Sequence, residues 1–317
     1  MDLPKFLKRE SPELREMKER ELLRMKERRA YSASFRNNAE HYNTLCNENP
    51  DLIKTLKEPF YLEIKDNDRN PKLAEIKSAF DALLEHPLVK KFKRNKMRLY
   101  VYHDNSDAIT VNAFLKKLDR STIRIWNGKY VAIASELLDI LTADEIKSGL
   151  AHELGHQLRS DHHARNIDSR KDSNPQDKEK CADKISVLIS RDPETLISVF
   201  DKLKKYGQQK IDDFLSSHST GDPGKDAQFK ESFERALSVY CRKYHLEHPE
   251  KQIRNKLIRE AGERLINPES ERELLAEIES ELLGRHTKIF PNHVKTEYPG
   301  LFTTKHINRK TDTPLEI

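Results

Sequence analysis

The chain of 317 residues contains little glycine and little cysteine, and it lacks a long apolar run. Its 9 glycines are too few for a glycine-rich β architecture or a flexible low-complexity protein. Its 3 cysteines do not form a disulfide framework, which favours a reducing compartment. No segment approaches the roughly 18 apolar residues of a membrane span, and the first residues lack the apolar core of a secretory signal. We therefore expect a cytoplasmic protein, although export into a host cell by a specialised secretion system would leave the same pattern.

Charged residues, in contrast, are abundant. They make up 35% of the chain, above the usual quarter, so we expect much solvated helix surface. The net charge of +5 combines interspersed residues of both signs and does not by itself require nucleic acid. A basic cluster at residues 90–98 offers only Phe92 for base stacking. We interpret this cluster as solvated surface and expect no nucleic-acid partner.

Local patterns predict both strands and helices. Residues 97–103 alternate in the manner of a strand, and the short apolar run at residues 130–134 predicts a second one. Thr142 and Glu145 have the spacing of a capping box, which predicts a helix that begins there and continues to about Arg159. The fold class expected from these patterns is α+β and predominantly helical.

The chain also divides by composition. Residues 1–70 are expected to form a charged helical extension, because their few apolar residues give only a thin, broken stripe. Residues 71–317 are expected to form the principal domain, with a helical C-terminal part from about residue 192.

The most informative segment is residues 151–156, which read AHELGH. His152 and His156 are four residues apart, so on a helix both imidazoles project from one face, about 40° past a full turn. Neutral imidazoles in this arrangement can bind one tetrahedral cation. Glu153 lies about 100° around the helix from His152, a poor position for a ligand but a good one for accepting a proton from water.

An apolar row lies on the other side of the same helix. Its members share a four-residue spacing: Ile146, Leu150, Leu154 and Leu158. The centre of this row is about 160° from the centre of the histidine pair. One face is therefore expected to pack in the core while the opposite face presents the ligands.

A catalytic zinc site needs a third protein ligand and an open position, and two candidates compete for the third place. His162 has the spacing of the metzincin pattern, but Arg159 occupies the position where metzincins need a glycine to turn the chain back. All 4 methionines lie upstream of the histidines, so the methionine that metzincins carry below the metal is also missing.

The second candidate is Glu179, four residues before Asp183. If this stretch is helical, the two carboxylates share a face, so that one can bind zinc and the other can orient a ligating histidine. Ala182 is small enough to let two helices approach. Cys181 is interpreted as a small buried residue, because two histidines and a carboxylate already form a complete ligand set.

Taken in order, five elements of the sequence resemble the HtpX-like and CAAX-prenyl-protease type of gluzincin zinc metallopeptidases. They are Asn112-Ala113-Phe114, the run from Ser135 to Glu145, residues 151–156, Glu179-x-x-Ala182-Asp183, and His248-Pro249 followed by Arg254. The resemblance covers about half of the chain, from Met97 to Arg254. It implies a zincin-like fold in which a small β-sheet lies against the HExxH helix and a helical region follows.

The resemblance also implies roles for individual residues. His152, His156 and Glu179 would bind Zn²⁺, Glu153 would act as the general base, and Asp183 would support a ligand. His248 and Arg254 would lie near the metal and steady the oxyanion or its surroundings.

The family's edge strand usually binds the substrate backbone, and by analogy the segment from Met97 to Phe114 could do so here by β-addition. Many family members are membrane proteins, whereas this chain shows no span.

These observations predict a zinc-dependent endopeptidase that hydrolyses peptide bonds in a protein or peptide substrate through a metal-activated water. Two alternatives stay open: a catalytically silent, zinc-stabilised binding or scaffold protein, and a metzincin-like protease with His162 as its third ligand. Cleavage that a chelator abolishes and zinc restores would argue against the silent protein.

Overall fold

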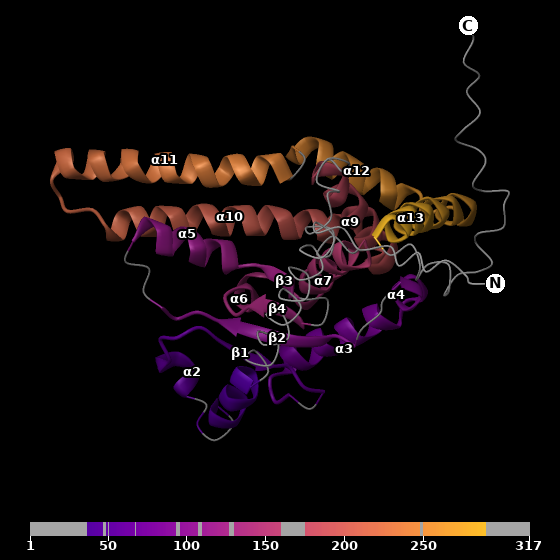
Figure 1. The fold of residues 1–317 in the computed structure, drawn as a ribbon, viewed down its shortest axis with the longest axis horizontal. Coiled ribbons are helices and arrows are strands. Elements are labelled where there is room, and N and C mark those ends of the chain that lie inside the picture. The colour runs from indigo at the N-terminus through magenta and orange to yellow at the C-terminus, as the bar shows by residue number, and fades with distance from the viewer. Residues whose placement is uncertain are drawn as a thin grey trace, which may run out of the picture.

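The computed structural model describes residues 37–46, 49, 51–66, 68–92, 96–106, 110–126, 130–159, 175–247 and 250–289. Within this part of the chain, helices dominate and surround one four-stranded sheet (Figure 1). The expected α+β, mostly helical class is therefore confirmed. Residues 1–36 lie outside the described residues, and the division of the chain at residue 70 stays a prediction.

The sheet has the strand order β1-β2-β4-β3. Its strands are β1 (Phe60–Glu63), β2 (Arg98–His103), β3 (Ile123–Trp126) and β4 (Tyr130–Ala134). β2 and β4 run parallel, while β1 pairs antiparallel with β2 and β3 pairs antiparallel with β4. The two predicted strands are thus present, and two short strands of four residues each were not anticipated.

β2 is an interior strand, so the expectation that the segment 97–114 forms a substrate-binding edge is wrong. Its backbone pairs with β1 on one side and with β4 on the other. Its side chains are buried on both faces, with Leu99 on the face of the main core and Tyr100 on the opposite face. Residues that are apolar on both faces stabilise a central position in a sheet. Among the strands that the structure describes, β1 and β3 are the outer ones.

Two layers cover the sheet. Helical residues 37–46 pack Ala39 against the tyrosine-rich face. The other face supports the main core together with helices α3 (Pro71–Glu85) and α7 (Ala143–Leu158). α7 has the central place in this core, because it packs against α3, β3 and the helices that follow it.

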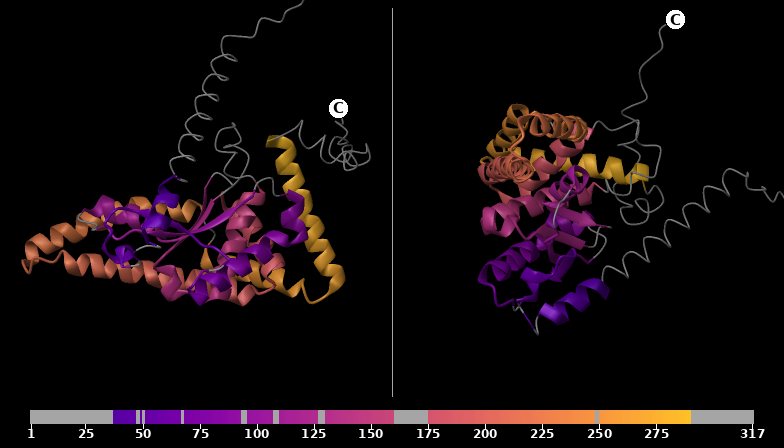
Figure 2. Two further views of the ribbon diagram at one scale, coloured as in Figure 1. Left: turned by 90° about the horizontal axis from the view of Figure 1, so that it is seen from below. Right: turned by 90° about the vertical axis from the view of Figure 1, so that its left-hand side faces the viewer.

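The remaining helices lie around this core or extend from it. They are α2 (Leu52–Thr55), α4 (Pro87–Phe92), α5 (Val111–Arg120), α6 (Leu137–Ile140), α9 (Pro175–Ser190), α10 (Pro193–Ser217), α11 (Pro223–Glu247), α12 (Lys251–Glu263) and α13 (Pro268–Ile289). α10 and α11 lie side by side as a long hairpin that projects beyond the sheet (Figures 1 and 2). Within the described part of the chain, no helix combines the length and apolar character that a membrane crossing requires.

Candidate metal centre

Helix α7 begins and packs as the sequence predicts. The Thr142 hydroxyl accepts a hydrogen bond from the Glu145 backbone N–H at 3.2 Å, and the Glu145 carboxylate accepts one from the Thr142 N–H at 2.8 Å. This capping box satisfies two backbone donors at the start of the helix. The expected apolar row is buried: Ile146, Leu150, Leu154 and Leu158. Core packing on one side therefore fixes which way the opposite side of α7 faces.

Helices α7 and α9 approach each other very closely at Gly155 and Ala182. A Cβ atom at Gly155 would lie 2.7 Å from the Ala182 Cα and 3.0 Å from its carbonyl oxygen. Only glycine fits there without moving a helix. Ala182, which was expected to let two helices approach because it is small, is buried at this contact. The role of Gly155 was not predicted, although a glycine inside a helix costs about 1 kcal/mol relative to alanine and so needs a structural reason.

This close approach brings three predicted ligands together. The Nε2 atoms of His152 and His156 are 3.2 Å apart. The Glu179 carboxylate oxygens lie 3.5 Å from His152 Nε2 and 3.3 Å from His156 Nε2. All three ligand atoms fall within 4.8 Å of one another, so the group could hold a metal ion.

A buried network of charges supports these three residues. Asp183 Oδ1 lies 2.9 Å from His152 Nδ1, a short contact that departs from ideal hydrogen-bond alignment. Arg254 donates through Nε and Nη2 to the two Asp183 oxygens, each at 2.8 Å, and through Nη2 to Glu179 at 3.3 Å. Asp183 and Arg254 thus lie near the histidines, as predicted. The Nε and Nη2 groups of Arg254 donate to carboxylates.

The electrostatics of the network are set by burial and by these partners. Burial alone would raise the pKa of Asp183, but the Arg254 charge and the His152 contact outweigh it and hold this pKa below its usual range. Burial likewise would lower the pKa of His152, yet its close contacts with the carboxylates of Asp183 and Glu179 raise it. The site therefore favours a charged Asp183 facing His152.

Glu153 lies beside the ligand group and is half-buried. Burial raises the pKa of its carboxyl above the ordinary value, and the nearby Glu179 carboxylate adds to this effect. The two imidazoles and Arg124 of β3 act in the opposite direction without cancelling it. A carboxylate with a raised pKa is a stronger base, which suits proton transfer near neutral pH.

Three residues considered in the sequence analysis are absent from the ligand group of the described residues. His162 and His248 fall outside the described residues. Cys181 is buried in the main core and is not part of the candidate ligand group, in line with its interpretation as a packing residue. Burial raises the pKa of its thiol to about 12, so it stays protonated at neutral pH.

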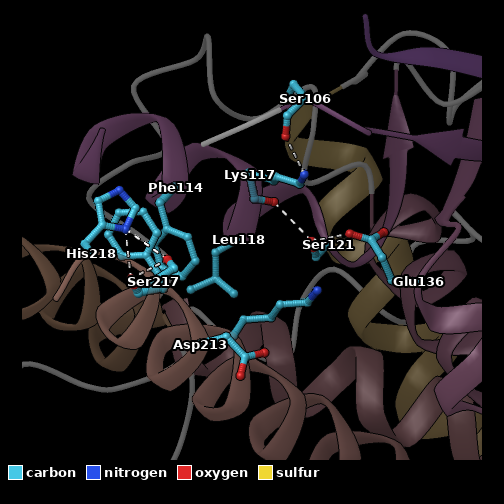
Figure 3. A pocket seen from close by; sticks show the side chains of 11 residues that line it. Ser106, Phe114, Lys117, Leu118, Ser121, Glu136, Asp213, Ser217 and His218 are labelled. Carbon is cyan, nitrogen blue, oxygen red and sulfur yellow. Dashed lines mark hydrogen bonds between the residues drawn. The ribbon is translucent and has the colours of Figure 1, made fainter. Parts of the chain in front are cut away.

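The Asn112-Ala113-Phe114 element lies at the start of α5, away from the ligand group. Asn112 and Ala113 are exposed, while Phe114 packs in a separate apolar cluster with Phe214 of α10. Beside this cluster is an open cavity of about 550 Å³ between α5 and α10 (Figure 3). None of its lining residues belongs to the ligand group.

A comparison with known protein families matches the part of the chain that contains the α7 residues of this site. Residues 86–176 match the model of peptidase family M48, which is the family of the HtpX-like and CAAX-prenyl proteases. The match contains His152, Glu153 and His156 and ends before Glu179. The place of Glu179 in the candidate ligand group is therefore supported by the geometry and not by this match. No curated protein and no solved structure is significantly similar to the chain. The resemblance expected from the sequence is therefore confirmed, and the chain carries a peptidase family M48 segment from residue 86 to residue 176.

Proposed function

We propose that this protein is a zinc-dependent endopeptidase that hydrolyses peptide bonds in a protein or peptide substrate. The observation that carries the proposal is the convergence of two imidazoles from α7 and one carboxylate from α9, with Glu153 beside them. The peptidase M48 match independently supports a hydrolase of peptide bonds.

The residues present fit a zinc ion. Two histidine nitrogens and one carboxylate oxygen are a donor set typical of catalytic zinc, which leaves a fourth position open. The surrounding charges fit as well, because the buried carboxylates of Glu179 and Asp183 share one guanidinium, that of Arg254, and the half-buried carboxylate of Glu153 lies beside this group. With neutral histidines and ionised carboxylates, this leaves two negative charges, which a divalent cation would neutralise.

Each residue then has a defined task. When bound, zinc supplies a Lewis acid that polarises a carbonyl group and lowers the pKa of water to about 7. Glu153 accepts the proton of the attacking water and delivers it to the leaving nitrogen. Asp183 holds the ring of His152 in one orientation, and Arg254 holds Asp183 and Glu179 together.

Arg254 is accordingly assigned a positioning role rather than contact with the oxyanion. Its guanidinium is buried and donates to both carboxylates. The oxyanion donor is proposed to be His248.

The substrate backbone is proposed to bind along β3 instead of β2. β3 is an edge strand of the sheet and packs against α7. Its Ile123 reaches so close to α7 that a Cβ at Gly149 would lie 2.6 Å from the Ile123 Cδ1. An extended peptide that adds to this outer strand by main-chain hydrogen bonds would pass the carboxylate of Glu153.

A cleavage assay on an unstructured protein tests the proposal. We expect cleavage that a chelator abolishes and that zinc restores. Glu153→Gln should keep its zinc and lose at least about 100-fold in rate, the scale of general-base catalysis. Zinc-loaded wild-type protein that cleaves nothing would favour the silent scaffold, and undiminished cleavage by Glu153→Gln would remove this mechanism.

A further inference from the structure

Phe200 of α10 contacts the polar network around the candidate metal centre, and no motif in the sequence marks it. The Cζ atom of Arg254 lies 3.6 Å from the centroid of the Phe200 ring. The His152 ring lies 5.5 Å from the same centroid, with the two ring planes at 81°. We propose that Phe200 is a positioning residue that holds the Arg254 guanidinium, and through it Asp183 and Glu179, in the geometry required for metal binding. This inference rests on the proposed function.

Stacking determines where the Arg254 donors point. A guanidinium is planar, and its N–H groups lie in that plane. At 3.6 Å from the ring centroid, the Arg254 Cζ is in van der Waals contact with the face of the Phe200 ring, so the ring limits how far the guanidinium can tilt. Asp183 and Glu179 accept hydrogen bonds from Arg254 in this arrangement. If the guanidinium tilted, it would lose the two-pronged contact with Asp183.

The aromatic face also suits a buried cation. The Arg254 side chain is only 7% exposed, so water cannot hydrate both faces of its guanidinium. The negative face of an aromatic ring attracts a cation and does so more strongly where water is excluded. An aliphatic side chain at position 200 would fill a similar volume without this attraction.

The same ring limits the orientation of His152. An edge-to-face contact between aromatic rings is a favoured arrangement. Phe200 packs in this way against His152, while Asp183 lies at the Nδ1 of the same imidazole. Phe200 thus acts on the metal ligands by two routes, one direct and one through Arg254.

Four proteins test this inference: wild type, Phe200→Leu, Phe200→Tyr and the control Phe214→Leu. Phe214 lies on the same helix and is buried, whereas Phe200 is partly buried, and Phe214 packs in a separate cluster of α5, α10 and α11 that contains none of the ligand group. The readouts are the zinc dissociation constant, measured by competition with a chromophoric chelator, and the visible absorption spectrum of the cobalt-substituted protein.

Phe200→Leu should weaken zinc binding by about 10-fold or more, the scale typical of losing an outer partner of a metal ligand. Its cobalt spectrum should change, because the ligands are less well oriented. Phe200→Tyr retains the aromatic face and should restore both properties, and Phe214→Leu should leave both at the wild-type value.

The outcomes separate this inference from the proposed function. Wild-type protein that bound neither metal would overturn the proposed metal site and this inference with it. Wild-type binding together with unchanged affinity in Phe200→Leu would overturn this inference alone. Equal losses in Phe200→Leu and Phe214→Leu, or no restoration by Phe200→Tyr, would likewise overturn it, since general core loosening would then be the cause.

Discussion

Helix α10 contacts the buried charged network, whereas the hairpin that it forms with α11 carries exposed charged pairs. Near its start, Phe200 contacts Arg254, whose side chain is 7% exposed and pairs with two buried carboxylates. On α11, the second helix of the hairpin, Arg235 pairs with Glu231, and their side chains are 77% and 64% exposed. The comparison teaches that an arginine–glutamate pair by itself indicates no role. Burial decides whether its loss is costly or negligible.

The largest effect is expected on zinc affinity when a candidate metal ligand in the buried region is removed. Glu179→Ala should reduce zinc affinity by more than 100-fold, because it removes the only carboxylate of the candidate ligand group. His162→Ala should keep the wild-type zinc content. Metal analysis of both purified proteins measures this directly, and the reverse result would establish the metzincin-like alternative.

Replacing the arginine of each pair by alanine should lower the free energy of unfolding far more in the buried region than on the exposed hairpin. Arg254→Ala leaves two buried carboxylates without their cation and should cost about 3–5 kcal/mol in the free energy of unfolding. Arg235→Ala on the exposed hairpin should change it by less than about 0.5 kcal/mol. Denaturant unfolding of the metal-free proteins compares the two, and equal losses would contradict the distinction.

Two glycines should respond to alanine with opposite signs. At Gly155 the new Cβ would meet the backbone of Ala182 at 2.7 Å, so stability should fall by about 1–3 kcal/mol. At Gly207, inside α10 on the hairpin, a Cβ would meet nothing within 4 Å. Gly207→Ala should therefore stabilise the protein by about 0.5–1 kcal/mol, the difference in helix propensity. Thermal unfolding of the two variants tests the pair, and a stable Gly155→Ala would show that α7 and α9 can separate freely.

The smallest expected effect is the dependence of stability on pH in metal-free protein. The pKa of Glu153 is higher in the folded protein than in the unfolded chain, where it is about 4.3. Ionisation of Glu153 therefore destabilises the folded protein as pH rises above about 4.3. Glu153→Gln should therefore be more stable than wild type at pH 7, with a difference that shrinks below about pH 4.

Asp226 on the hairpin should behave in the opposite way. Hydrogen bonds from Ser219 and Thr220 lower its pKa to about 2. Its stabilising contribution is present above the unfolded value of about 3.9 and is lost as pH falls toward 2. Asp226→Asn should be less stable than wild type at pH 7, and the difference should disappear as pH falls through about 2. Unfolding curves across pH measure both variants, and the same sign for both would contradict the assigned environments.

Some of the fold could be predicted because its cause is local. The cap at Thr142, the buried row from Ile146 to Leu158 and the strand at β4 depend on residues close together in the chain, and all three are present. β1 and β3 were missed because four residues give too short a pattern to recognise. The place of β2 inside the sheet depended on which segments pair with it, which no local pattern records.

The sequence by itself determined the pair of imidazoles, because a four-residue spacing on a helix places two side chains on one face wherever that helix lies. It also identified the residue types that can bind zinc. Only the tertiary structure brought Glu179 to that face, through the contact of Gly155 with Ala182, and placed Arg254 and Phe200 behind it. Those residues lie on different helices, and close packing between helices, rather than spacing along one of them, decides which side chains meet.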